Sequence, residues 1–313
     1  MSAPSRSWWS QVRGYQGRNL WFAAFVSPFV VGLALFVYIP ILWSAYLSLF
    51  DARNTVTPTR FVGFANYSYL LSDPLFLSSL GTFIGFAAFI VPLTFVCSLG
   101  LALLLNNLRW GQAFFRSVFF IPTAVSYVVA AIVWRLAFFN GARFGLANSL
   151  IREAGGEPVN WLGGTNSWYW VVLVSLRLWL QVGFYMILFI AGLNRIPQDT
   201  YEAAALDGAT GWRLLRYVTL PQLRATSVAV VMLLLISAFQ AFDEFWNTLS
   251  SITGSYPPYA RPPLVHLYLI SIGGSQQDLG LGGAGTMILT ALIVVFGLAQ
   301  NWLVNLGQRK EGR

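Results

Sequence analysis

Charged side chains are scarce in this sequence. They make up 10% of its 313 residues, against about 25% in typical soluble domains. Hydrophobic residues reach 57%, above the usual range of roughly 45–50%. The net charge of +8 does not indicate nucleic-acid binding, because the basic residues lie between apolar runs and do not cluster on one polar face. The composition predicts a protein surrounded by membrane lipid, with no nucleic-acid partner.

Cysteine and lysine are almost absent. The single cysteine, Cys97, lies in an apolar run, so neither an intrachain disulfide nor a cysteine-based metal site is expected. The single lysine, Lys310, lies near the C-terminus and outside any Gly-x-x-x-x-Gly-Lys-Ser/Thr loop, the segment that holds nucleotide phosphates. We therefore expect no catalytic residues and no cofactor in this chain.

The sequence is rich in long apolar runs. Roughly 20 apolar residues are needed to cross a hydrocarbon layer of ~30 Å. Six runs are long enough, and they are Leu20–Phe50, Ser78–Leu105, Ser117–Phe139, Trp168–Leu193, Ala225–Trp246 and Ala284–Gly307. These runs predict an all-α membrane protein with six transmembrane helices, all in one domain of residues 1–313.

Lysine and arginine are unevenly distributed between alternate connecting segments. Of the 19 basic residues, twelve fall on the side that holds both ends of the chain and five on the other side. The remaining two, Arg135 and Arg177, fall within spans. Since basic loops stay in the cytoplasm, both termini are predicted to be cytoplasmic. Residues 51–77, 140–167 and 248–283 are then predicted to be outside.

One cytoplasmic segment contains signals for two short helices. Asp199 stands three residues before Glu202, a variant of the capping box, so a helix is expected to begin there and to end at Gly208. Thr210 can cap a second helix, which Pro221 is expected to end before the fifth span. The pattern predicts a helix, a sharp turn and another helix at the cytoplasmic surface.

The same segment carries a family motif. It reads Glu202-Ala203-Ala204, three residues, Gly208, nine residues and Val218-Thr219-Leu220-Pro221. It resembles the loop of permease subunits of binding-protein-dependent ABC importers, with valine in place of isoleucine. The chain is most similar to the carbohydrate branch, the maltose-type and glycerol-3-phosphate-type permeases. The segments that carry this likeness are Phe61–Phe76, Phe114–Pro122, Gly192–Pro197 and Ser237–Phe245, whereas Ser250–Pro263 departs from the branch's usual Leu-Thr-x-Gly-Gly-Pro.

The resemblance implies a type I ABC importer permease fold in a bacterial or archaeal cytoplasmic membrane. The expected partners are a second homologous permease, two copies of an ABC ATPase that would bind ATP and Mg, and an extracytoplasmic sugar-binding protein. The loop of residues 194–224 would dock in a cleft of the ATPase. The resemblance assigns this coupling to Glu202, Ala203, Ala204, Asp207, Gly208, Arg213, Leu220 and Pro221. Without it, Glu202 could simply cap its own helix, and Arg213 could simply hold the loop in the cytoplasm.

Polar side chains within the spans are candidates for a substrate pathway, because such groups are costly in lipid unless they are paired or face water. In the fifth span, Ser237, Gln240 and Glu244 lie at helical spacing on one face, and Gln240, Asp243 and Asn247 on an adjoining one. Amides and hydroxyls beside aromatic rings suit a neutral sugar. The predicted pathway residues are Tyr127, Gln181, Tyr185, Ser237, Gln240, Asp243, Glu244 and Asn247.

Other interpretations of these polar residues stay open. Arg177 could pair with Asp243 or Glu244 only to neutralise buried charge, and Arg135 could do the same near the outer end of the third span. A proton-coupled secondary transporter would use Asp243 and Glu244 as proton carriers, although the two halves of the chain show no repeat. A passive scaffold would explain the loop but not the polar residues of the fifth span.

Overall fold

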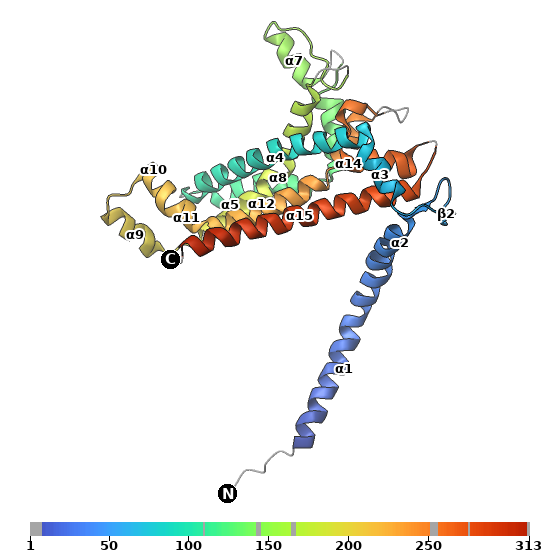
Figure 1. Cartoon of the computed structure of the whole chain (residues 1–313). Coiled ribbons are helices and arrows are strands. Elements are labelled where there is room, and N and C mark those ends of the chain that lie inside the picture. Colours follow the sequence, from blue (N-terminus) through green and yellow to red (C-terminus); the bar gives the residue numbers. More distant parts are fainter. Residues whose placement is uncertain are drawn as a thin grey trace. The chain divides into compact units, whose positions relative to one another are not determined.

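The computed structural model describes residues 8–108, 110–141, 145–163, 167–250, 256–274 and 276–311, without the side chains of 8–19, 301 and 303–311. The chain divides into two compact units. One consists of residues 1–69 and 270–287, and the other of residues 70–269 and 288–313. Helices dominate both units (Figure 1). In the described part of the chain, the strands are limited to β1 (Phe50–Asp51) and β2 (Arg60–Phe61), which pair antiparallel with Phe50 opposite Phe61.

The first unit begins with one long helical stretch. It consists of α1 (Trp8–Leu33), the π-helical turn η1 (Ala34–Tyr38) and α2 (Ile39–Leu47). Pro40 has no N–H to donate, and the wider turn just before it lets the Ile39 N–H bond to the Ala34 carbonyl instead. Residues 20–47 form an apolar candidate span, in which Leu47 is the one residue buried against the described part of the chain.

The rest of this unit is a small polar structure that follows α2. Arg53 Nε lies 3.2 Å from Asp278 Oδ2, and Arg60 lies 3.7 Å from Asp51. The backbone N–H of Asn54 donates to the Gln277 carbonyl at 2.7 Å, and the Gln277 N–H donates to the Asn54 side chain at 3.0 Å. These bonds join the segment after α2 to the start of α15 (Leu279–Glu311).

The second unit is a bundle built around α4 (Pro74–Asn106), α8 (Tyr169–Leu193) and α12 (Arg224–Phe239), which run side by side in Figure 1. Asp73 caps α4 by accepting the Leu75 N–H at 3.0 Å. The core combines aliphatic and aromatic residues, and its fully buried side chains include Phe86, Phe189 and Phe245. The smaller helices of this unit are α7 (Leu146–Glu153), η5 (Pro258–Ala260) and α14 (Pro263–Tyr268). The sequence boundaries of the two units fall within α3 (Ala65–Ser72) and η6 (Leu269–Gly273).

The third predicted span is not one straight helix. It consists of α5 (Gln112–Phe120), η2 (Ile121–Ala124), α6 (Tyr127–Val133) and η3 (Trp134–Phe138), with a bend of 94° after η2. Val125 adopts an extended conformation, and Ser126 then caps α6 through the Val128 N–H at 3.3 Å. The bend packs closely on α8, where a Cβ on Gly183 would overlap the Phe119 carbonyl.

The fifth predicted span, Ala225–Trp246, is also broken. Helix α12 ends at Phe239, and α13 (Asp243–Leu249) begins after three intervening residues. Between them, Gln240 has φ −88° and ψ 12°, and Phe242 has φ −133° and ψ −59°. The prediction that one continuous helix places Ser237, Gln240 and Glu244 on one face, and Gln240, Asp243 and Asn247 on an adjoining face, is therefore wrong. The residues from Asp243 onward belong to a separate helix.

Candidate spans number four to six among the residues described. Four helices are long and apolar enough by themselves, and they are Leu20–Leu47, Pro74–Asn106, Tyr169–Leu193 and Leu279–Gln300. Two bent helix pairs qualify if each pair counts as one span, and they are Gln112–Ala124 with Tyr127–Phe138 and Gly211–Gln222 with Arg224–Phe239. The structure thus supports a multi-pass helical membrane protein.

Candidate functional site: a polar cavity and a surface loop

The surface loop has the predicted sharp turn at Gly208. Helix α9 (Gln198–Leu206) ends there, and Gly208 has a φ of 75°, in the left-handed region that glycine tolerates. The Gly208 N–H donates to the Ala205 carbonyl at 3.1 Å, and the Ala209 N–H donates to the Ala204 carbonyl at 2.9 Å. This pair of bonds is a Schellman motif, and it confirms that Gly208 stops the helix.

The predicted cap of the first loop helix is wrong, and that of the second is correct in position only. Pro197 precedes the first residue of α9 and occupies the cap position, so Asp199 lies inside the first turn and forms no capping box with Glu202. Thr210 precedes α10 (Gly211–Leu214) but makes no side-chain cap bond. A proline at the cap position supplies the required extended backbone without a side-chain acceptor.

Pro221 does not end the second loop helix. The π-helical turn η4 (Leu215–Thr219) precedes α11 (Leu220–Gln222), and the Leu220 N–H bonds to the Leu215 carbonyl. This wider turn accommodates the residue without an N–H, as η1 does before Pro40. The helical path therefore continues to Gln222, and a bend of 70° separates it from α12.

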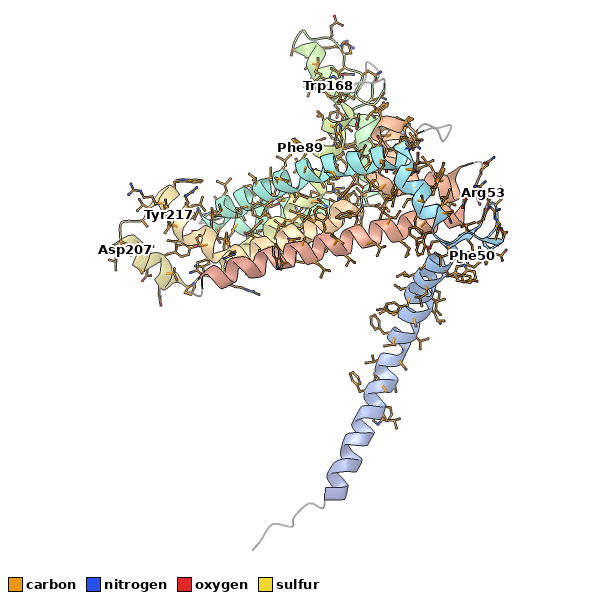
Figure 2. All side chains as sticks on the ribbon, in the orientation of Figure 1. Phe50, Arg53, Phe89, Trp168, Asp207 and Tyr217 are labelled. Carbon is orange, nitrogen blue, oxygen red and sulfur yellow. The ribbon has the colours of Figure 1, made fainter. Side chains whose placement is uncertain are left out.

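Most of the predicted coupling residues are exposed. Glu202, Ala203, Asp207, Gly208, Arg213 and Pro221 are exposed, Leu220 is half-buried and Ala204 is buried. The loop also exposes three large apolar side chains that sequence reasoning missed, with exposed fractions of 92% for Leu206, 68% for Trp212 and 71% for Tyr217. Asp207 and Tyr217 mark this end of the second unit in Figure 2. The sequence does contain a signal for this exposed apolar surface, because these large apolar residues lie in an otherwise polar segment.

A cavity of about 270 Å³ lies within the second unit, between the bend of the third span, α8 and the end of α12. Four of the eight predicted pathway residues line it: Tyr127, Gln181, Tyr185 and Ser237. The other lining residues are Thr123, Val125, Leu180 and Phe184, which sequence reasoning did not select. The structure therefore brings together side chains from three separate segments of the chain.

Hydrogen bonds link the polar side chains of the cavity. The Gln181 amide nitrogen donates to the Tyr127 hydroxyl at 2.9 Å and to the Ser237 hydroxyl at 2.7 Å. Thr123 donates to the Leu180 carbonyl at 3.2 Å. Phe184 and Tyr185 add aromatic surface. The wall combines hydroxyls and an amide with aromatic rings, the combination that suits a neutral polar ligand.

The other four predicted pathway residues lie outside this cavity. Gln240 and Asp243 are exposed, and the Asn247 side chain donates to the Asp243 carbonyl at 2.8 Å. Glu244 is buried, with 2% of its side chain exposed, and forms an ion pair with Arg177. Helix α12 ends at Phe239, before all four residues, so none of them continues the helix that carries Ser237.

The two arginines expected within spans both bind the ends of helices. Arg177 donates to the Ser237 carbonyl in the last turn of α12 and, at 2.9 Å, to the Ser237 hydroxyl. Arg135 donates at 3.3 Å and 2.6 Å to the carbonyls of Asn247 and Ser250, at the end of α13. The expectation that Arg135 neutralises a buried acid is not met, because these partners are carbonyl groups. A cation at a helix C-terminus is nevertheless favourable.

A second cavity, of about 910 Å³, lies at the loop end of the second unit. The ends of α4 and α8 and residues of α9, α10 and η4 line it. In the described part of the chain, no group of three or more His, Cys, Asp or Glu side chains is placed to hold a metal ion.

A buried histidine lies away from both cavities. His266 Nε2 lies 3.7 Å from Asp73 Oδ2, beside the first turn of α4. Burial lowers the pKa of His266, the nearby Arg261 lowers it further, and Asp73 opposes the shift. The net direction indicates that His266 is neutral near pH 7.

Known proteins are similar to this chain in sequence and in fold. Residues 95–311 match the family described as the binding-protein-dependent transport system inner membrane component. The chain is 31% identical to the arabinooligosaccharides transport system permease protein AraP of Bacillus subtilis, over 88% of this chain and 85% of the relative. It is 28% identical to the alpha-glucoside transport system permease protein AglF of Rhizobium meliloti, over 92% of this chain and 82% of the relative.

A solved structure has the same fold at low identity. A chain of the bacterial alginate ABC transporter, in complex with alginate pentasaccharide-bound periplasmic protein, matches with a TM-score of 0.79 and 19% identity, over 95% of this chain and 97% of that chain. The fold and its apolar helices define a multi-pass ABC importer permease, a transport component and not an enzyme. The chain belongs to the family of inner membrane components of binding-protein-dependent transport systems. The resemblance seen in the loop motif is thereby confirmed.

Proposed function

We propose that this chain is the membrane-spanning subunit of an ATP-driven sugar importer in a bacterial or archaeal cytoplasmic membrane. It would cross the membrane six times, with both termini in the cytoplasm, and form half of the pathway with a second homologous permease. The relatives named for arabinooligosaccharide and alpha-glucoside transport support a carbohydrate substrate. The alginate transporter solved with its periplasmic protein supports delivery by a sugar-binding protein.

The cavity beside Gln181 is the observation that carries the sugar assignment. Its volume of about 270 Å³ is near the lower end of the range for small-molecule sites, roughly 300–1,000 Å³, and suits one sugar ring. Hydroxyl and amide groups of the wall can bond to sugar hydroxyls, while aromatic rings can cover the C–H faces. Tyr127, Gln181 and Ser237 are the proposed polar contacts, and Phe184 and Tyr185 the aromatic ones.

The surface loop is the proposed attachment site for two ATPase copies, which would bind ATP and Mg. The turn at Gly208 presents α9, and the three exposed apolar side chains, Leu206, Trp212 and Tyr217, supply the kind of anchors that protein interfaces use. The bend at residue 223 connects this loop directly to α12, whose last turn carries Ser237. A movement of the loop can therefore reach the cavity through a single helix.

A proton-coupled carrier is less consistent with the geometry. Glu244, one of its two proposed proton carriers, is held in a buried ion pair with Arg177, which favours a carboxylate that stays charged. The other, Asp243, is exposed and does not line the cavity. The exposed loop would have no role in such a carrier.

Uptake by reconstituted vesicles tests the proposal. Vesicles containing both permeases and the ATPase, with binding protein outside and ATP with Mg inside, should take up a neutral oligosaccharide. Omission of ATP should abolish uptake, and collapse of the proton gradient should not. Uptake that needs the proton gradient and continues without ATP would contradict the proposal.

A further inference from the structure

A buried ion pair lies directly behind the wall of the cavity. Arg177 comes from α8 and Glu244 from the first turn of α13, and each side chain is only 2% exposed. Neither residue lines the cavity. The guanidinium nevertheless reaches the wall, because it donates to the Ser237 hydroxyl at 2.9 Å and lies 5.7 Å from the centre of the Tyr127 ring.

The charge of Arg177 is therefore separated from the cavity by a single side chain. Ser237 accepts bonds from both Arg177 and Gln181, so Gln181 lies two hydrogen bonds from the guanidinium and a ligand bonded to Gln181 would lie three hydrogen bonds from it. Charges interact strongly over such distances inside a protein, where the effective dielectric constant is low. The presence or absence of a counter-ion for Arg177 therefore affects which ligands bind in the cavity.

Glu244 is the described acid that balances it. Asp243, its neighbour on the same turn, is exposed, and Arg135 bonds to carbonyls at the opposite end of α13. The Tyr127 and Phe86 rings lie 5.7 and 5.4 Å from the guanidinium and carry no net charge. With Glu244 ionised, the group behind the wall is a neutral pair.

We propose that the Arg177–Glu244 pair determines charge selectivity in the translocation pathway, so that the cavity accepts neutral sugar units and disfavours uronic acid units. This inference rests on the proposed function and names its substrate class. The fold alone does not decide the matter, because a transporter of the same fold carries the acidic polysaccharide alginate. The preference for neutral or acidic sugars must therefore depend on side chains near the cavity.

The variant Glu244→Gln tests the inference, because it removes the carboxylate and keeps the shape and the guanidinium. Glucose and glucuronate are suitable probes, since they differ by a carboxylate in place of a hydroxymethyl group. Each would be titrated into the purified complex of both permeases and the ATPase at constant ionic strength. The rise in unfolding temperature gives the apparent affinity, because a ligand that binds the folded state stabilises it.

We expect the wild-type complex to bind glucose more tightly than glucuronate. Glu244→Gln should bind glucuronate about tenfold more tightly than wild type does. The double variant Arg177→Gln with Glu244→Gln should lose that gain, because it has neither charge. Asp243→Asn is the matched control, since it removes an adjacent but exposed negative charge, and it should show no gain.

Three outcomes would overturn the inference. One is wild-type preference for glucuronate, a result that does not depend on whether Glu244→Gln assembles. The second is an assembled Glu244→Gln complex without increased glucuronate affinity, and the third is an equal increase in the double variant or in Asp243→Asn. If the wild-type complex imports a neutral sugar while any of these is seen, only the inference fails. If it imports no sugar at all, the proposed function fails as well.

Discussion

Substitution of Gly208 should separate assembly of the complex from coupling. The residue has a φ of 75° and provides the N–H that closes the turn after α9. A Cβ at this position would meet no other atom within 4 Å, so a larger residue would not clash. The free-energy cost of substitution therefore comes from the backbone conformation, and its size depends on the side chain that is introduced.

The magnitude follows from the left-handed backbone. An ordinary L-residue in this region costs ~1–2 kcal/mol, asparagine tolerates it better, and a β-branched residue resists it most. Such a cost shifts the equilibrium between the loop with the left-handed turn at residue 208 and the loop without it by roughly 5–30-fold. Little packing opposes the change, since Ala204 and Thr219 are the buried residues in the described loop of residues 198–222. Transport should decrease in the order glycine, asparagine, alanine, valine.

The assay measures sugar uptake and ATPase activity of complexes matched for subunit content. Gly100→Val is the control, because Gly100 lies inside α4, has no positive φ and also has no atom within 4 Å of an added Cβ. It should retain more transport than Gly208→Val. Normal uptake and unchanged ATPase activity in Gly208→Val would refute the role of the turn, as would an equal loss in Gly100→Val.

The remaining predictions concern the loop, the cavity and a buried histidine. Glu202→Lys should reduce recovery of the ATPase in a pull-down more than Glu202→Gln does, because it reverses an exposed charge on α9; equal recovery would argue against a charge contact. Gln181→Leu should reduce vesicle uptake about tenfold or more, because a hydrogen bond to sugar at ~0.5–1.5 kcal/mol is lost and leucine leaves sugar hydroxyls unpaired at a further ~1–3 kcal/mol, while 1.4 kcal/mol is about tenfold. Gln240→Leu should have a smaller effect, because Gln240 is exposed outside the cavity, and equal losses would contradict this placement. The unfolding temperature should fall as the pH drops below about 6.5, because the pKa of His266 is lower in the folded chain and the unfolded chain binds the proton first; His266→Gln should reduce this fall, and an unchanged pH profile would contradict it.

The sequence predicts well the features that depend on local rules. Runs of apolar residues placed the second span near α4 and the fourth within one residue of α8, because membrane crossing requires little more than length and composition. Gly208 was correctly expected to stop a helix, since left-handed backbone favours glycine wherever it occurs. Gln181, Tyr127 and Ser237 can be grouped by chemistry from the sequence, but their hydrogen bonds depend on tertiary structure.

The breaks in the helices could not be predicted in the same way. Pro221 was expected to end a helix, but a π-helical turn before it removed the need for its missing N–H. The break at residues 240–242 contains neither proline nor glycine, so no local signal marks it. Helical periodicity places Glu244 and Asn247 on faces of the fifth span, but the helix that carries those faces ends at Phe239. A helical face can be extrapolated only as far as the helix itself continues.

That break explains why charged residues are tolerated inside this apolar chain. A helix that ends within a membrane protein leaves carbonyl groups without intrahelical partners, and in lipid such groups are costly. Arg177 donates to the last turn of α12, and Arg135 donates to carbonyls at the end of α13. The first of these cations then requires an anion, which Glu244 supplies from the first turn of α13, where a negative charge is also favoured by the helix dipole. Because both charges are satisfied by the break and by each other, Ser237 and Gln181 can form a polar but uncharged cavity wall beside them.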